Sequence, residues 1–308
     1  MSRRDALLGL LVAVVWGVNF VVIDEGLPGV PPLFFAAIRF TCVSLLTFVV
    51  ARPKAHWRYV VGVGLFMSAG QFGLLYLALG AGMPSGLASL VVQAQVPLTI
   101  LLASATNGER ISRRQLVGLG VALLGLVIVA WGRGGHVALT GLVLVLAAGA
   151  SWAVGNVLAR RAGASGLSLV VWSAPVAPLP LLALSATLEG PSAWWTALQD
   201  WGWRQTASTA FTVLVATVVG FGIWNALLAK NATSRVVPFA LLVPVAGLAA
   251  AWIVQGEQPA VPVIAGGVVL LAGAFVALTG GLRPAAVRSS RARSAGSAVP
   301  GAPPAKPD

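Results

Sequence analysis

Uncharged polar side chains occur inside long apolar stretches of this chain, where most neighbours are Leu, Val, Ala and Gly. An amide carries both donors and an acceptor, and its burial is unfavourable unless these groups find partners. Such residues are candidates for binding a small polar solute. The alternative is hydrogen bonding between helices, worth about 0.6 kcal/mol on average. The candidates are Asn19, Gln71, Ser89, Gln93, Asn156 and Asn225.

Four of the residues near the fourth apolar stretch recur at intervals of four. They are Ser85, Ser89, Gln93 and Pro97. Residues four apart lie on one face of a helix, so this face is predicted to point away from lipid. Pro97 also cannot donate a backbone hydrogen bond, which frees a carbonyl in mid-helix and favours a buried or cavity-facing position.

Large aromatic residues also lie within the apolar stretches. Trp16, Tyr76, Trp152 and Trp224 are the ones that we assign to a candidate binding region. An indole presents a flat apolar face and one N–H donor, which suits an amphipathic ligand. Packing between helices is the alternative role.

Charged residues are rare inside the apolar stretches, and only Arg39 lies clearly within one. It could bind a substrate carboxylate. We favour a structural role, in which it snorkels toward the interface or ties helix ends together through Asp24 or Glu25. Asp24, Glu25 and Glu189 lie near predicted helix ends, where they are candidates for coupling transport to ion movement.

The composition identifies the elements that must position these residues. Of 308 residues, 58% are hydrophobic and 9% are charged, which excludes an ordinary soluble globular enzyme. Apolar runs of about 20 residues can each cross a bilayer. We predict an all-α integral membrane protein with ten transmembrane helices. Their expected ranges are 6–23, 33–51, 59–79, 85–105, 114–131, 138–158, 167–187, 207–229, 234–254 and 261–281.

The positions of the basic residues predict the orientation. Of the 20 Lys and Arg residues, only Arg133 and Arg204 fall in predicted outer loops, and only Arg39 falls in a span. Because Lys and Arg accumulate on the cytoplasmic side, both termini are predicted to be cytoplasmic. Residues 282–308 are rich in Ala, Ser, Pro and Arg and are predicted to form a disordered basic tail, which anchors the topology and can contact lipid headgroups.

Self-comparison reveals an internal repeat. Glu109, Gly118 and Gly125 recur 148 residues later as Glu257, Gly266 and Gly273, Tyr76 falls on Trp224, and Pro97 matches Pro244 at one residue less. Two five-helix repeats are therefore expected at 1–133 and 138–281. Because five is odd, the second copy enters the membrane inverted. Inverted repeats are typical of transporters that work by alternating access.

The sequence lacks the residues that several kinds of chemistry require. The sequence has no Gly-rich phosphate-binding loop, and both histidines fall in predicted loops away from any metal-ligand cluster, so we expect no cofactor and no metal. The net charge of +12 resides in loops, which excludes a nucleic-acid partner as its explanation. An integral membrane enzyme and a purely structural subunit remain as rivals. The expected partners are a small molecule and membrane lipid, and a homodimer stays open.

The order of short motifs along the chain resembles the EamA family of the drug/metabolite transporter superfamily. The resemblance covers roughly residues 1–282. In the first half it rests on Trp16-Gly17-Val18-Asn19-Phe20-Val21-Val22, Arg39-Phe40, Gly82-Met83-Pro84-Ser85-Gly86-Leu87-Ala88-Ser89-Leu90-Val91 and Gly108-Glu109-Arg110. In the second half it rests on Ser151-Trp152-Ala153-Val154-Gly155-Asn156, Val171-Trp172-Ser173, Val219-Gly220-Phe221-Gly222-Ile223-Trp224 and Leu242-Val243-Pro244-Val245.

Within that family the chain is most similar to bacterial exporters of O-acetylserine and cysteine-pathway metabolites. The resemblance implies ten helices in two inverted halves, residence in the inner membrane and efflux of small amino-acid-like solutes. The alternative within transport is an exchanger or facilitator of another metabolite or of a drug-like amine.

Overall fold

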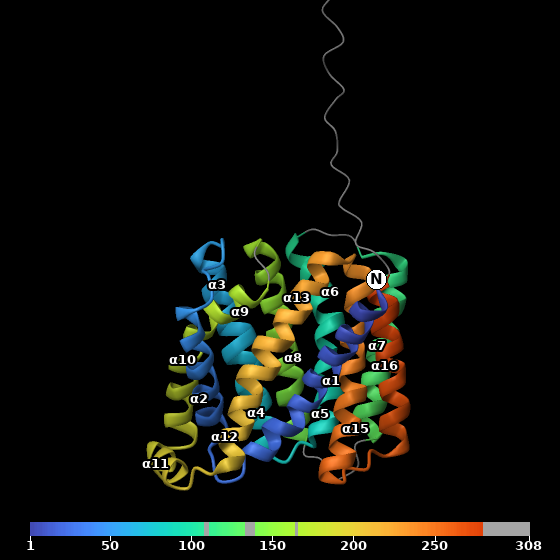
Figure 1. Ribbon diagram of the computed structural model, residues 1–308. Coiled ribbons are helices and arrows are strands. Elements are labelled where there is room, and N and C mark those ends of the chain that lie inside the picture. Colours follow the sequence, from blue (N-terminus) through green and yellow to red (C-terminus); the bar gives the residue numbers. More distant parts are fainter. Residues whose placement is uncertain (108–110, 133–138, 164–165, 280–308) are drawn as a thin grey trace, which may run out of the picture.

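The protein is a bundle of helices that run side by side between two ends (Figure 1). The structure, a computed structural model, describes residues 1–107, 111–132, 139–163 and 166–279, and every regular element in these ranges is helical. Glu109 and the predicted tail 282–308 lie outside the described residues. We call the end of the bundle that carries Arg3 the N-terminal end, and the opposite one the far end.

The first half begins with a capped helix. Ser2 and Asp5 each accept a hydrogen bond from the other's backbone N–H, which satisfies free donors at the helix start. The elements of this half are α1 (Arg3–Gly26), α2 (Pro32–Leu45), η1 (Leu46–Phe48), α3 (Trp57–Val63), η2 (Gly64–Gly70), α4 (Gln71–Gly80), α5 (Ser85–Val91), η3 (Val92–Ala94), α6 (Gln95–Asn107) and α7 (Arg113–Gly132).

The second half contains one helix that the pattern of spans does not predict. Gly190, at φ 85°, ends the preceding helix, and Pro191 starts α11 at the far end (Figure 1). The elements are α8 (Leu139–Ala162), α9 (Leu167–Ser173), η4 (Ala174–Val176), α10 (Pro178–Leu188), α11 (Pro191–Gln199), α12 (Trp203–Ala210), η5 (Phe211–Val219), α13 (Gly220–Lys230), α14 (Thr233–Val236), η6 (Val237–Leu242), α15 (Val243–Gln255) and α16 (Val261–Thr279).

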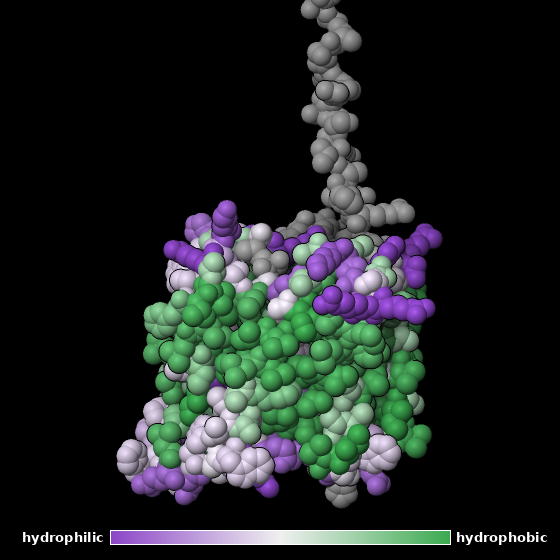
Figure 2. All heavy atoms as spheres, in the orientation of Figure 1, coloured by the Kyte–Doolittle hydropathy of each residue, from purple (hydrophilic) through white to green (hydrophobic). Residues whose placement is uncertain are grey.

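On the face that Figure 2 shows, a belt of hydrophobic side chains lies between two hydrophilic ends. Among the described residues, eight helices are long and apolar enough to cross a membrane, and a ninth is added if 167–176 and 178–188, bent by 42°, form one span. The predicted span 33–51 is shorter than expected, because it is helical only as the 14 residues of α2 and the three of η1. The protein is thus a multi-pass membrane protein.

The last helix of each half packs directly on the other. A Cβ added to Gly118 would lie 2.8 Å from Cα of Ala277, and one added to Gly266 would lie 2.7 Å from N of Val129. The second contact is the repeat equivalent of the first, because Gly266 lies 148 positions after Gly118 and Val129 lies 148 positions before Ala277. The order of contacts also shows that α7 and α16 are antiparallel. Glycine lets the two backbones approach this closely.

Candidate functional site

Two helices contain a π-helical segment at corresponding places in the two halves. Residues 64–70 form η2, and a shift of 148 places them inside η5 at 211–219. A π-helical turn changes the hydrogen-bond register from i→i−4 to i→i−5, and such turns are frequent at functional sites. The repeat therefore includes this irregularity of the backbone.

Each π-helical segment accepts a hydrogen bond from the opposite half. Nε1 of Trp16 in α1 donates to the carbonyl oxygen of Ala216 at 3.0 Å. Oγ of Ser151 in α8 donates to the carbonyl oxygen of Phe66 at 2.7 Å. The first helix of each half thus holds the irregular segment of the other half.

The fourth helical stretch of each half is interrupted by a 3₁₀ turn before a proline. Pro97 follows η3 and Pro244 follows η6, which matches the predicted repeat. Pro244 has no N–H to donate to the carbonyl oxygen of Ala240, which instead accepts from the backbone N–H of Val243 and from Nε2 of Gln93. The Gln93 contact, at 3.2 Å, joins the two interrupted helices.

The predicted face of α5 and η3 is buried against the second half, as expected of a face turned from lipid. Ser85, Ser89 and Gln93 are 0%, 0% and 3% exposed. Oγ of Ser89 donates to the carbonyl oxygen of Gly86, and a Cβ added to Gly247 of α15 would lie 2.7 Å from Cβ of Ser89. Gln93 also accepts from Gln95 at 3.3 Å.

The interior aromatic residues form contacts across the halves. The ring centroid of Trp16 lies 5.1 Å from that of Phe221 and 5.3 Å from that of Trp224. In the opposite direction, Trp152 of α8 meets Phe72 of α4 at 6.4 Å. Three of the four aromatic residues that the sequence analysis selected, Trp16, Trp152 and Trp224, therefore make contacts between the halves.

Two of the predicted amides lie beside these aromatic contacts along the chain. Asn156 follows Trp152 by one turn, and its Nδ2 donates to Oγ1 of Thr99 in α6 at 3.2 Å. Asn225 adjoins Trp224, is half-buried, and its Nδ2 has no hydrogen-bond partner. Asn156 thus has a helix-to-helix bond, and Asn225 retains a free donor.

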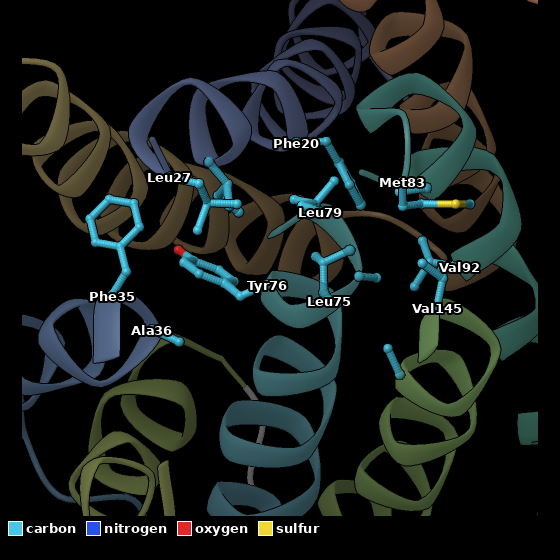
Figure 3. Close-up of a cluster of buried hydrophobic side chains, with 14 of the residues drawn as sticks. Phe20, Leu27, Phe35, Ala36, Leu75, Tyr76, Leu79, Met83, Val92 and Val145 are labelled. Carbon is cyan, nitrogen blue, oxygen red and sulfur yellow. The ribbon is translucent and has the colours of Figure 1, made fainter. Parts of the chain in front are cut away.

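Tyr76 lies in the hydrophobic core, where its hydroxyl group interacts with Arg39. It is 1% exposed, and its ring packs at 5.8 Å from that of Phe35. Figure 3 shows it between Leu27, Phe35 and Leu75, with Leu79 and Phe20 nearby. Its packing is that of a core residue, and its predicted role in binding stays a prediction.

Three polar side chains of α1, α2 and α4 are buried with unpartnered atoms. Asn19, Arg39 and Gln71 are 7%, 4% and 4% exposed. Oδ1 of Asn19 and Oε1 of Gln71 are acceptors without a donor, and Nε and Nη1 of Arg39 are donors without an acceptor. Buried polar groups normally have partners, so this set needs an explanation.

Arg39 does not reach the interface as a snorkelling side chain would. Its guanidinium carbon lies 4.0 Å from the ring centroid of Phe72 and 5.4 Å from that of Phe40. The carboxylates of Asp24 and Glu25 have a different hydrogen-bond donor, the side chain of Gln255. Arg39 thus packs on aromatic rings, and both of its predicted roles, structural and anion-binding, stay predictions.

The far end holds a network that joins the halves through Gln255. Its Nε2 donates to Asp24 at 2.7 Å and to Glu25 at 3.1 Å, and its Oε1 accepts from Oγ of Ser85 at 2.7 Å. Glu257 accepts from the backbone N–H groups of Ser85 and Gly86 at 2.8 and 3.1 Å, which caps the N-terminus of α5.

Glu189 occupies a similar place at the start of α2. It accepts from the backbone N–H groups of Leu33 and Phe34 at 2.8 and 3.2 Å, and from Oγ of Ser185. Nε1 of Trp194 donates to the same Ser185 hydroxyl at 2.7 Å. This places Glu189 at a helix terminus, and its role in coupling stays a prediction.

Sequence reasoning missed several partners in these contacts. Phe72, Thr99, Phe221 and Gln255 all contact predicted site residues. Phe221 could have been found, since it lies one helical turn before the adjacent pair Trp224 and Asn225. The others carry no signal of spacing, because their partners are distant in sequence.

The chemistry available here is binding rather than covalent catalysis. Amides, hydroxyls, indoles and one guanidinium offer hydrogen bonds, ring faces and a positive charge. In the part of the chain that the structure describes, no group of three or more His, Cys, Asp or Glu is placed to hold a metal ion. The geometry suits recognition of a small polar solute between the two halves.

A family comparison agrees with this geometry. The EamA-like transporter family matches residues 4–131 and again residues 139–279. The chain belongs to the EamA-like transporter family. It is therefore a membrane transporter and not an enzyme, and the two matches support an internal repeat.

Similar proteins match the EamA chain over almost its whole length. A "probable amino-acid metabolite efflux pump" of Salmonella typhimurium is 43% identical, covering 91% of this chain and 96% of its own. The protein of the same name from Escherichia coli is 41% identical over the same shares. A "probable terminal-alkyne amino-acid exporter" of Streptantibioticus cattleyicolor is 27% identical, covering 90% and 94%.

The fold also has a counterpart among solved structures. A protein known from a crystal structure superposes with a TM-score of 0.59 at 21% identity, covering 90% of this chain and 97% of that one. At this identity the likeness concerns the fold alone.

Proposed function

We propose that this EamA protein is a secondary exporter of small amino-acid-like metabolites, of the O-acetylserine and cysteine type, that resides in the inner membrane. Two relatives at 41 to 43% identity that are named amino-acid metabolite efflux pumps support the solute class. The observation that carries the proposal is the hydrogen bond from Gln93 to Ala240, which joins corresponding helix breaks of the two halves. Discontinuous helices at a repeat interface are where secondary transporters bind their solutes.

The proposed architecture is ten spans in two inverted halves, 1–133 and 138–281, with both termini cytoplasmic. It counts α2 with η1 as one short span, and α9 with α10 as one bent span. The antiparallel, self-matching contact of α7 and α16 supports the inversion. The distribution of Lys and Arg supports the orientation, which makes the far end the outer end.

Alternating access follows from this arrangement. Two related halves can exchange conformations, which opens a site near the bilayer midplane first to one side and then to the other. The π-helical and 3₁₀ segments are where the helices are irregular, so they are natural points of bending. Amides at Gln93 and Asn19 would orient a zwitterionic solute, while Trp16, Trp152 and Trp224 shield its apolar part.

The outer-end network supplies the candidates for ion coupling. Asp24 and Glu25 share the amide of Gln255, so a change in protonation of either carboxylate alters a contact between the halves. Glu189 is bound at the start of α2 and would act through that helix. These three carboxylates are the groups to test if transport follows a proton gradient.

Transport in proteoliposomes tests the proposal. Purified protein is reconstituted, and the flux of radiolabelled cysteine or O-acetylserine is measured with and without an imposed pH gradient. Flux that rises with the gradient establishes a proton-coupled exporter, and gradient-independent exchange establishes an exchanger or facilitator. If neither solute moves with folded protein, the proposed solute class is wrong.

Variants connect the flux to the site. Gln93→Ala and Asn19→Ala are expected to lower flux without lowering expression, since each removes a buried amide. Gln199→Ala changes an exposed amide of α11 and serves as the control. Normal flux in both buried-amide variants would refute their assignment.

Reporter fusions test the topology. An alkaline phosphatase fused after Asp308 should be inactive and a green fluorescent protein fused there should fluoresce, because the C-terminus is proposed to be cytoplasmic. Active phosphatase at this position would overturn the orientation.

A further inference from the structure

The buried guanidinium of Arg39 has two nitrogens, Nε and Nη1, without an acceptor among the residues that the structure describes. Arg39 is 4% exposed and lies about two turns into α2, which begins at the far end. Removing an ionised group from water costs several kcal/mol even after relaxation of the protein, unless an opposite charge or hydrogen bonds replace the water. Inside a membrane protein such a residue normally faces a pathway or a partner.

Its surroundings offset only part of this cost. Phe72 and Phe40 present their rings to the guanidinium at 4.0 and 5.4 Å, and Tyr76 interacts with Arg39 electrostatically and through a side-chain hydrogen bond. A cation–π contact is worth about 0.5 to 2 kcal/mol. None of these neighbours carries a negative charge, and Nε and Nη1 keep no acceptor. Two of the guanidinium nitrogens therefore remain able to donate to an added acceptor.

The position of Arg39 connects it to the contact between the halves. Phe72 covers the guanidinium and meets Trp152 of α8, the first helix of the second half, at 6.4 Å. Movement of α8 relative to α4 would therefore change how well Arg39 is covered. A cation at this place can be exposed to a solute in one conformation and occluded in another.

The unpartnered atoms of the first half include both kinds of group that a zwitterion requires. Arg39 offers two free donors with a positive charge, whereas Asn19 and Gln71 each offer a free, buried acceptor oxygen. A carboxylate requires the former and an ammonium group the latter. A simple amine has no acceptor for the free donors of Arg39.

From these contacts we propose that Arg39 binds the free carboxylate of the transported solute. The protein accordingly selects amino acids over their esters and over the corresponding amines. This inference rests on the proposed function and narrows its solute class. It assigns to Arg39 a role that the neutral amides cannot perform, since only Arg39 distinguishes a carboxylate from an uncharged carbonyl by charge.

The test compares solutes that differ only at the carboxylate. In proteoliposomes loaded with cysteine, uptake of radiolabelled cysteine in exchange is competed by O-acetylserine, by its methyl ester, or by cysteamine. Wild-type protein should prefer the free acid over the ester by about ten- to a hundredfold, the range that a charge-assisted hydrogen bond provides. In Arg39→Gln this preference should fall to within about threefold, mainly through weaker binding of the acid.

The control variant changes an arginine–aromatic pair on the surface of the protein. Arg58 is exposed, with its guanidinium carbon 4.7 Å from the ring centroid of Tyr59, so Arg58→Gln removes a similar contact outside the bundle. The preference of Arg58→Gln for the free acid over the ester should equal that of the wild-type protein. Arg39→Lys keeps the charge but not the planar donor set, and should weaken binding of the acid severalfold while leaving the ester unchanged.

The outcomes distinguish failure of the proposed function from failure of the proposed role of Arg39. Wild-type protein that moves no amino acid refutes the proposed function. Wild-type protein that moves acid and ester equally, or Arg39→Gln that keeps the wild-type preference, refutes the role of Arg39 alone. If Arg39→Gln yields no folded protein, Arg39→Lys decides, because an equal loss for acid and ester would assign Arg39 a structural role.

Discussion

The side-chain amide of Gln93 donates to the carbonyl oxygen of Ala240, and the two residues are 147 positions apart, as are Pro97 and Pro244. Gln93 in the first half and Ala240 in the second half therefore occupy corresponding positions of the repeat. The bond lies where two interrupted helices of opposite halves meet. A change of conformation that separates the halves must alter this bond.

Gln93→Ala is expected to impair transport more than folding. Two hydrogen bonds are lost, to Ala240 and from Gln95, and each contributes about 1 kcal/mol to the free energy of unfolding, while Val243 still donates to the Ala240 carbonyl. Exchange rate and thermal unfolding should be measured on the same preparation. Equal losses in Gln93→Ala and in the exposed-amide control Gln199→Ala would contradict this.

Gly125→Ala is expected to destabilise the contact of α7 with α16. The added Cβ would lie 2.6 Å from Cα of Leu270, which is backbone and cannot turn aside. Overpacking of this kind costs about 1 to 3 kcal/mol.

Gly120→Ala on the same helix is the matched control. A Cβ there meets nothing within 4 Å, so the change should be neutral or slightly stabilising through better helix propensity. Thermal unfolding in detergent distinguishes the two variants, and equal melting temperatures would show that α7 and α16 do not require close approach.

Gln255→Ala is expected to loosen the far end of the bundle. It removes the bonds to Asp24, Glu25 and Ser85 together, and with them a polar link of α15 to α1 and α5. In a Cys42→Ser background, a reporter Ala251→Cys lies at a position that is 0% exposed. A membrane-impermeant maleimide should label it severalfold faster once Gln255 is replaced.

Gln258→Ala provides the comparison for this labelling, because Gln258 is exposed on the loop that follows the same helix. Its labelling rate should match that of the background. A rate unaffected by Gln255→Ala would mean that the network does not restrict access to Ala251→Cys at the far end of the bundle.

Trp16→Phe is expected to weaken the contact between α1 and the π-helical segment η5. Phenylalanine keeps a ring near Phe221 and Trp224 but loses the N–H that donates to Ala216. The expected cost is about 1 kcal/mol of stability together with slower exchange. Trp131→Phe, at a side chain that is 90% exposed, should change neither, and a similar effect of both variants would argue against a specific role for the indole N–H.

Much of the fold was predictable because its signals are local. A run of about 20 apolar residues predicts a span wherever it occurs, and intervals of four place Ser85, Ser89 and Gln93 on one helix face. Pro97 likewise predicts an interrupted helix. The repeat was visible in Glu257, Gly266 and Gly273, since identical residues at one separation need no structure to be recognised.

The partners of the buried polar groups could not be predicted. Nothing near Gln93 in sequence indicates Ala240, nothing near Ser85 indicates Gln255, and the Phe72 ring that covers Arg39 comes from another helix. The sequence by itself determined which side chains must avoid lipid, because hydrophobicity and helical period act residue by residue. Only the tertiary structure decided which of them satisfy one another and which, like Nε and Nη1 of Arg39, have no acceptor among the described residues, because that depends on how distant helices pack.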